Sequence, residues 1–252
     1  MKRVCIVIPI YKSELSVEEK YSIKNTIRHL GQYDIWFIMP KKMDLRSFQE
    51  FNKIRIKKFE DTYFQSVDMY SKLLLNPHFY EKFIEYDYML IVQPDAYIFG
   101  DGKQLEYFMN MKIDYWGAPW YKPWEVRRIE PKQSFEQLQK SDILMDLFCG
   151  RRKKCDVGNG GLSLRRVDMT IKLLKHKLVY LKWWEKHEDL FFAYHGTHNH
   201  IGYRVASFAQ AREFSMEERM REEIRKGFIP FGVHAWKKWY PQMQNEIEIA
   251  EN

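Results

Sequence analysis

The chain has 252 residues, of which 45% are hydrophobic, 16% aromatic and 30% charged. This length can bury one substantial core, and the composition excludes disorder over most of the chain. The formal net charge of +7 suits an anionic partner, but charge alone does not choose among nucleotide diphosphates, nucleic acids and acidic lipids.

Two further features concern the compartment. The three cysteines include no Cys-x-x-Cys pair, which argues against a disulfide framework or a zinc ribbon and fits a reducing cytoplasm. The apolar run Val4–Ile10 is short and contains Pro9, so it predicts a buried first strand and not a signal peptide. No stretch approaches 18 uninterrupted apolar residues, so no membrane-spanning helix is expected.

The first hundred residues alternate between strand and helix patterns. Strands are expected at four apolar runs, namely Val4–Ile10, Asp34–Met39, Ile54–Phe59 and Tyr88–Val92. Helices are expected between them at residues 16–31, Asp44–Asn52 and Tyr63–Leu75, the first with a capping-box sequence at its start. This alternation predicts an α/β fold with a mainly parallel sheet and helices on both faces, in which ligands bind at the carboxyl ends of the strands.

The second half of the chain is less regular. Loops are expected at Trp116–Trp120 and in the glycine-rich segment Asp156–Leu164, and a weak helical pattern covers Phe135–Phe148. Helices are expected at Val167–Lys182 and Glu188–Tyr194. Because no repeat or low-complexity linker interrupts the chain, we expect a single domain over residues 1–240 and a frayed tail over 241–252.

An acidic residue follows the fourth expected strand. Asp95 would point into the crevice above the sheet, where its carboxylate could hold Mg²⁺ or Mn²⁺ against a nucleotide diphosphate. The usual signature in this role is Asp-x-Asp, whereas the first position here is Gln93. The site has one charge fewer, so the cation is expected to bind weakly or to be dispensable. The alternative is that Asp95 only caps a turn.

Three later segments also carry groups suited to chemistry. Gly160 and Gly161 allow backbone to approach a ligand closely, Glu188 and Asp189 offer a carboxylate base, and His234 could contact a metal or a pyrophosphate. Taken one at a time, these segments could equally be a tight turn, helix N-terminal acids and a structural histidine.

A basic run at Arg151–Lys154 is the one tight cluster of positive charge. It is either a solvated loop or a contact with phosphate groups or a membrane surface, and the sequence leaves both possibilities open.

The segments taken in order resemble one family. They read Gln-x-Asp, Trp-Gly-Ala-Pro-Trp, Gly-Asn-Gly-Gly-Leu-Ser-Leu-Arg, Glu-Asp-x-Phe-Phe and Pro-Phe-Gly-x-His-Ala-Trp. This array resembles bacterial GT-A-like glycosyltransferases of polysaccharide and glycan gene clusters, long known only as a domain of unknown function. It is more distantly similar to β-1,4-galactosyltransferases. The resemblance covers about residues 4 to 239 and implies a GT-A, Rossmann-like fold.

The resemblance also implies where the donor would lie. Pro9 and Tyr11 match the first-strand loop where the nucleotide base usually sits, and Gly160 and Gly161 match the loop beside the donor sugar. Two tryptophans would pack the floor of the site or stack on a sugar, namely Trp116 and Trp120.

The remaining matches concern the metal and the base. Asp95 matches the acid that binds metal or diphosphate, Gln93 stands in the degenerate first position, and His234 matches the histidine that completes the coordination of Mn²⁺ or Mg²⁺. Asp189, or failing it Glu188, matches the acid that activates the acceptor.

The activity implied is transfer of a sugar from a nucleoside-diphosphate sugar to a hydroxyl group of a glycan or polysaccharide-precursor acceptor, including a lipid-linked glycan. The resemblance favours inversion, because the acid pair supplies a base. The expected compartment is the cytoplasm, with peripheral contact at the inner face of the membrane left open.

Three rivals remain, and the sequence disfavours two of them. A sugar nucleotidyltransferase usually has a glycine-rich phosphate loop after its first strand, but the segment Pro9–Leu15 contains no glycine. A nucleic-acid binder would interleave aromatic residues with a basic stripe, which this chain does not do, so no nucleic-acid partner is expected. A catalytically inactive binding or scaffolding protein is the third, and Gln93 is its main support.

Overall fold

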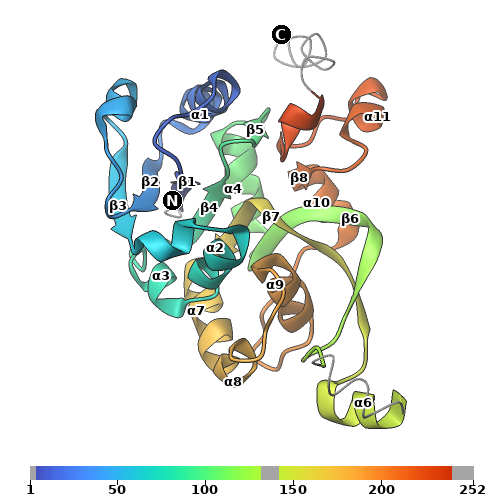
Figure 1. The fold of residues 1–252 in the computed structure, drawn as a ribbon. Coiled ribbons are helices and arrows are strands. Elements are labelled where there is room, and N and C mark those ends of the chain that lie inside the picture. Colours follow the sequence, from blue (N-terminus) through green and yellow to red (C-terminus); the bar gives the residue numbers. More distant parts are fainter. Residues whose placement is uncertain (1–3, 132–141, 240–252) are drawn as a thin grey trace.

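The apolar run that begins at Val4 forms a central strand of a six-stranded sheet in the computed structural model of the protein, which describes residues 4–131 and 142–239 (Figure 1). Across the sheet the strands are β3 (Arg55–Phe59), β2 (Asp34–Pro40), β1 (Val4–Pro9), β4 (Tyr88–Val92), β7 (Lys153–Arg166) and β6 (Tyr115–Val126). The first four run parallel, β7 is antiparallel to β4, and β6 is antiparallel to β7. A small second sheet has the order β5 (Tyr97–Ile98), β9 (Gly232–Val233) and β8 (Ser215–Met216).

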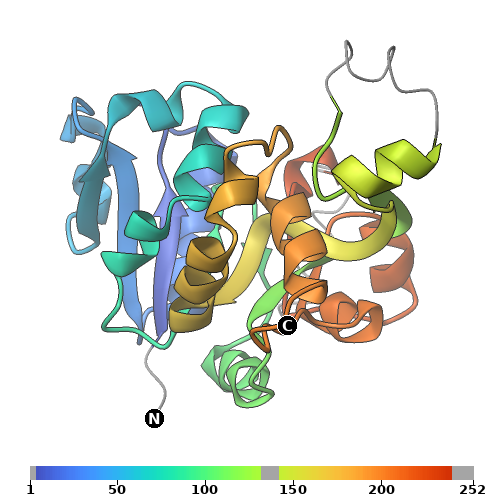
Figure 2. The ribbon, with the colours of Figure 1, turned by 90° about the horizontal axis from the view of Figure 1, so that it is seen from below.

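Helices cover both faces of the large sheet because alternate residues of its strands are apolar on each side. From β1, Ile6 and Ile8 face a core shared with α1 (Val17–Leu30), α4 (Gly102–Asn110) and α10 (Phe208–Phe214). Cys5 and Val7 face the opposite core, which is shared with α2 (Val67–Leu74), α3 (Pro77–Glu81), α7 (Val167–His176) and α9 (Glu188–Thr197). This arrangement confirms the predicted α/β architecture, and Figure 2 shows the same layers from below.

Shorter helices complete the described chain. They are η1 (Arg46–Phe51), η2 (Asp61–Phe64), α6 (Asp142–Cys149), α8 (Leu178–Leu181), α11 (Met220–Arg225) and η3 (Trp236–Trp239). Within the described ranges, no helix combines the length and the apolar character that crossing a membrane requires.

The expected elements of the first half are confirmed, with two local differences. The four strands lie within a residue or two of their expected bounds, and Ser16 and Glu19 form the predicted capping box at the start of α1. The helix expected at Asp44–Asn52 is a 3₁₀ helix. The helix expected from Tyr63 divides into η2 and α2 because the Ser66 side chain caps a new helix by accepting a hydrogen bond from Met69 N.

Both loops expected in the second half are wrong, because both segments are strands. Trp116–Trp120 lies in β6 and Asp156–Leu164 lies in β7, which pair with several register shifts. β6 is an edge strand, where the missing N–H of Pro119 is tolerated. A side chain at Gly117 would lie 2.5 Å from Asn159 O, so the glycine that suggests a loop instead permits the close approach of two strands.

Two other expectations are settled in part. The helix expected at Val167–Lys182 ends at His176 and resumes as α8. The helical pattern over Phe135–Phe148 is observed only as α6, since residues 135–141 lie outside the described residues, as does the expected tail 241–252.

Candidate active site

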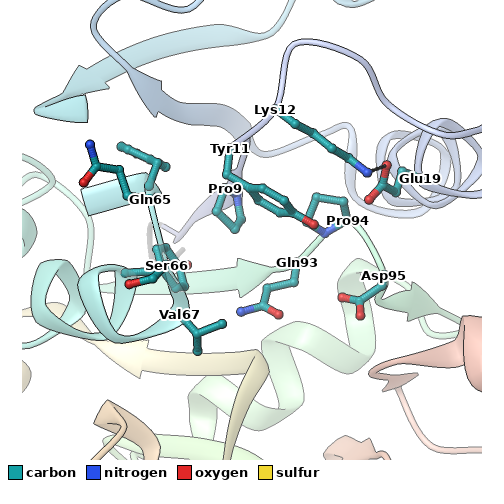
Figure 3. Close-up of a pocket in the computed structure, with 12 residues that line it drawn as sticks. Pro9, Tyr11, Lys12, Glu19, Gln65, Ser66, Val67, Gln93, Pro94 and Asp95 are labelled. Carbon is teal, nitrogen blue, oxygen red and sulfur yellow. Dashed lines mark ion pairs between the residues drawn. The ribbon is translucent and has the colours of Figure 1, made fainter. Parts of the chain in front are cut away.

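A cleft of about 640 Å³ opens at the carboxyl ends of β1 and β4 (Figure 3). Its walls come from the loop after β1, the first turn of α1, the η2–α2 junction and the loop after β4. Four residues singled out from the sequence line it together, namely Pro9, Tyr11, Gln93 and Asp95. The Tyr11 ring is about half exposed and lies across the opening from Gln93 and Asp95 (Figure 3).

A lysine in the same cleft was not predicted. Lys12 Nζ lies 2.7 Å from Glu19 Oε2, and Glu19 is buried and accepts a hydrogen bond from Ser16 N through the same oxygen. The hydrogen bond to Glu19 raises the pKa of Lys12, so its ammonium group stays charged beside the cleft. Its place directly after Tyr11 in the loop is the only signal in the sequence that could have identified it.

The small sheet brings His234 to the end of β4. Val233 of β9 pairs with Tyr97 of β5, and His234 Nε2 then lies 3.1 Å from Gln93 Oε1 and 3.3 Å from Asp95 Oδ1. The three residues predicted to hold a metal or a diphosphate therefore meet, although His234 and Asp95 are far apart in the chain.

Glu217 approaches the other side of the same imidazole. Its Oε2 lies 3.4 Å from His234 Nδ1, and its Oε1 lies 2.8 Å from Lys238 Nζ. Burial lowers the pKa of His234, but the carboxylates of Asp95 and Glu217 outweigh it and raise that pKa to about 9. Burial raises the pKa of Glu217, but His234 and Lys238 outweigh it and lower that pKa to about 2. The two carboxylates on either side of the imidazole therefore favour its protonated form.

The donor set at this point suits a hard divalent cation through three atoms, Gln93 Oε1, Asp95 Oδ1 and His234 Nε2. Among residues 4–131 and 142–239, no three side chains of the His, Cys, Asp or Glu type form a metal-binding group, and one of the three candidate ligands here is the amide of Gln93. A metal would also have to replace the proton on His234 Nε2, since an imidazole binds metal only in its neutral form.

Two glycines of β7 separate this cluster from the acid pair. A Cβ atom at Gly161 would overlap the His234 imidazole, and one at Gly160 would lie 2.5 Å from Glu188 Oε1. The backbone at this point is fixed by a hydrogen bond of 2.9 Å from Gln93 N to Gly161 O. The glycines therefore sit at the junction of the two groups predicted from the sequence, and both positions need the absence of a side chain.

Glu188 is a member of a buried network. Its Oε1 accepts a hydrogen bond of 3.2 Å from Arg165 Nη2, and its Oε2 accepts one of 2.9 Å from Ser71 Oγ. Arg165 is fully buried and also donates to the hydroxyl of Tyr80 at 2.7 Å. Both carboxylate oxygens of Glu188 therefore accept hydrogen bonds from buried side chains of the protein. The network was missed because its members are far apart in the chain.

Asp189 has different surroundings. Its Oδ1 accepts a hydrogen bond of 2.6 Å from Leu190 N, and within the described part of the chain it forms no ion pair with a lysine or arginine. Burial and the charge of Glu188 raise the pKa of Asp189 well above its usual range. A carboxylate with a raised pKa is better suited to accept a proton near neutral pH than one neutralised by a buried arginine.

The two tryptophans expected at the floor of the site belong to the cores. Trp116 is fully buried and packs against the rings of Phe108 and Phe214, so it is not placed to stack on a ligand. Trp120 is nearly buried, and a Cβ at Gly158 would lie 2.5 Å from its ring.

Comparisons with known proteins agree with this architecture. The sequence model of a family described as a protein of unknown function (DUF5672) matches residues 53–234. No curated protein matches the chain. Mouse xyloside xylosyltransferase 1, in its apo form, is 9% identical with a TM-score of 0.50, over 92% of this chain and 96% of that one.

A second solved structure is core-mannan synthase A from Aspergillus fumigatus in a form with Mn and GDP. It is 11% identical with a TM-score of 0.51, over 77% of this chain and 69% of that one. At such identities the likeness concerns the fold, and it confirms that the chain has the fold of GT-A glycosyltransferases.

Proposed function

The chain belongs to the DUF5672 family, and we propose that it is a glycosyltransferase that moves a sugar from a nucleoside-diphosphate sugar to a hydroxyl group of a glycan or polysaccharide-precursor acceptor. The observation that carries this proposal is the meeting of Gln93, Asp95 and His234 at the end of β4, with the two glycines of β7 between this cluster and Glu188, the neighbour of Asp189. Both solved structures described above are glycosyltransferases, and one of them is in a form with Mn and GDP.

The donor would lie in the cleft between Tyr11 and Asp95. The exposed ring of Tyr11 offers a face on which a nucleotide base could stack, and the cation Lys12 lies beside the same opening. Gln93, Asp95 and His234 would hold Mn²⁺ or Mg²⁺. When bound, the cation would neutralise charge on the diphosphate leaving group.

The transfer step needs a base on the acceptor side. The acceptor hydroxyl oxygen forms a bond to the anomeric carbon while the bond from that carbon to the diphosphate breaks. The hydroxyl proton passes to the carboxylate of Asp189. Attack on the face opposite the leaving group inverts the anomeric centre. Asp189 takes this role, and Glu188 positions the start of α9 through its bonds to Arg165 and Ser71.

Five further features that the sequence resemblance implies are included in this proposal. These features are a bacterial origin, a cytoplasmic location, the distant similarity to β-1,4-galactosyltransferases, a lipid-linked acceptor and peripheral contact with the inner face of the membrane. No nucleic-acid partner is proposed.

Calorimetric titration with UDP-, GDP- and TDP-sugars, with and without Mn²⁺, tests the donor part of the proposal. At least one donor should bind, and Tyr11→Ala should weaken its binding by about tenfold or more because a base–aromatic stack is worth about 1–3 kcal/mol. Tyr107→Ala is the matched control, since Tyr107 is equally exposed but lies on α4 outside the cleft.

Binding without transfer identifies the rival function. If a sugar nucleotide binds but is neither transferred nor hydrolysed, the chain is an inactive sugar-nucleotide-binding protein, which the amide of Gln93 favours. If no nucleoside diphosphate binds with metal present, the proposal is wrong.

A further inference from the structure

The helix α6 is apolar on two sides, and the two sides differ in how far their side chains are exposed. Met145 and Cys149 point inward and are buried, as one face of a short helix should be. The opposite side carries Ile143 and Leu147, which are 80% and 69% exposed, with Leu144 and Phe148 also on the surface. Apolar side chains gathered in this way on an exposed helix indicate an interaction surface.

A run of four basic residues follows this helix directly. Arg151 and Arg152 are exposed and each forms one ion pair, with Asp146 at 3.9 Å and with Glu125 at 3.8 Å. Lys153 and Lys154 are exposed on β7, and within the described ranges neither forms an ion pair. At least two positive charges are thus left next to the apolar face of α6.

A second exposed apolar group lies at the same end of the molecule. On α8 and just beyond it, Leu178, Val179 and Trp183 are all about half exposed or more. Figure 1 shows α6 and α8 along the same lower edge. The segment after β6 links the two regions, since Arg128 lies over the ring of Tyr180 on α8 and Ile129 N donates to Cys149 O at the end of α6 at 3.1 Å.

We propose that α6 and the basic run Arg151–Lys154 dock the protein onto an anionic membrane surface. Ile143 and Leu147 would enter the boundary between headgroups and acyl chains, and the basic residues would pair with lipid phosphates. An apolar helix face beside basic residues has the charge and polarity that such a surface complements. A second copy of this chain is a poorer partner, because it also carries a formal net charge of +7.

The docked orientation bears on the acceptor, and this step rests on the proposed function. The loop after α8 leads directly into α9, and Trp184 Nε1 donates to His187 O at 3.1 Å next to the acid pair. A membrane at the α6–α8 edge would therefore lie near the loop that carries Asp189. A lipid-linked glycan is the class of acceptor that such an arrangement would favour.

Vesicle sedimentation tests the docking independently of enzymatic activity, because it measures only the fraction of protein bound to lipid. The full chain should sediment with vesicles of phosphatidylcholine and phosphatidylglycerol, and less with phosphatidylcholine alone. Replacing residues 151–154 with Ser should weaken binding to anionic vesicles by about tenfold or more, since each basic residue near such a surface contributes about a fivefold change. A matched control replaces four exposed lysines elsewhere with Ser, namely Lys24, Lys53, Lys82 and Lys103.

The apolar face has its own variant. Ile143→Ser with Leu147→Ser should reduce the sedimented fraction even at high salt, where the charge contribution is screened. Val17→Ser with Ile84→Ser removes two exposed apolar side chains elsewhere and should leave sedimentation unchanged.

The contrary outcomes are distinct. The docking proposal would be wrong if the wild-type chain failed to bind anionic vesicles. It would also be wrong if the 151–154 variant and the Ile143→Ser, Leu147→Ser variant both bound them as well as the wild type does. Both results hold whether or not the protein transfers sugar. A dimer in light scattering that Ile143→Ser with Leu147→Ser converts to a monomer would assign this face to a second copy. The proposed function would remain intact in each case, because donor binding and transfer to a soluble acceptor are measured separately.

Discussion

The two sides of the site are built by different parts of the chain. The donor side consists of the loops after β1 and β4, each of which directly follows an apolar strand and carries its functional residues within a few positions, from Tyr11 to Lys12 and from Gln93 to Asp95. The transfer side consists of β7 and the start of α9, where Glu188 is held by partners distant in the sequence and Asp189 is its neighbour in the chain.

Because the two sides come from different segments, mutations should affect donor binding and sugar transfer separately. Changes on the donor side should alter donor affinity, whereas changes on the transfer side should alter stability or rate. Gly160 and Gly161 lie where the two sides meet. Gly160 adjoins Glu188 and Gly161 adjoins His234, so a substitution at each glycine should affect a different side.

The largest effect is expected for Glu188→Gln on the transfer side. Removing this charge leaves Arg165 buried without its ionic partner, and breaking a buried pair typically costs about 3–5 kcal/mol. Urea unfolding should show a loss of that order. The neighbouring change Asp189→Asn should keep or raise the stability, because the raised pKa of Asp189 means that folding disfavours its ionised form. Equal unfolding midpoints for Glu188→Gln and the wild type would contradict the structural role of Glu188.

Alanine at each of the two glycines should separate the two sides at their junction. Gly161→Ala would displace His234, and the overpacking typically costs about 1–3 kcal/mol, so Mn²⁺-dependent donor binding should weaken about tenfold. Gly160→Ala would displace Glu188 and should mainly lower stability. Calorimetry and urea unfolding on both variants check this, and identical behaviour of the two would remove the distinction.

On the donor side, Asp95→Asn and His234→Ala should each weaken Mn²⁺-dependent donor binding by about tenfold or more, an effect of the size seen when groups supporting a metal are removed. Gln93→Glu should act in the opposite direction, because a second carboxylate adds a negative charge to the ligand set. Titrations of donor at several Mn²⁺ concentrations measure both changes. Activity that survives complete chelation by EDTA would rule out the metal role and leave Asp95 as a hydrogen-bonding residue.

The smallest expected effect is on the pH dependence of transfer. A base works only when deprotonated, so the rate should rise with pH through the pKa of Asp189. Because burial and Glu188 raise that pKa, the acidic limb of kcat/KM should lie at a higher pH than for an ordinary aspartate. An acidic limb at the usual carboxylate pKa would point to a different base.

The sequence predicted the donor side well because its signals are local. Each buried strand is an uninterrupted apolar run, and a polar residue just beyond a parallel strand must lie at the ligand-binding edge of the sheet. Tyr11, Gln93 and Asp95 therefore reach the same cleft as expected.

The transfer side and the surroundings of His234 were predicted only in part because they depend on long-range pairing. Glu217 contacts His234, but no local pattern in the sequence indicates that the pairing of β8 with β9 would bring these two residues together. The glycines and prolines of β6 and β7 are typical of loops, and only the pairing of these two strands shows why they are tolerated. Resemblance to a family, and not periodicity, was the source of the roles given to His234 and Asp189.

The central claim is sugar transfer with Asp189 as the base, and the most direct test compares the transfer rates of wild-type protein and Asp189→Asn with the donor identified by titration. A general base typically contributes about 10² to 10⁴-fold, so Asp189→Asn should transfer sugar more slowly by about that factor while donor affinity stays nearly unchanged. Transfer by Asp189→Asn at the wild-type rate would contradict the account.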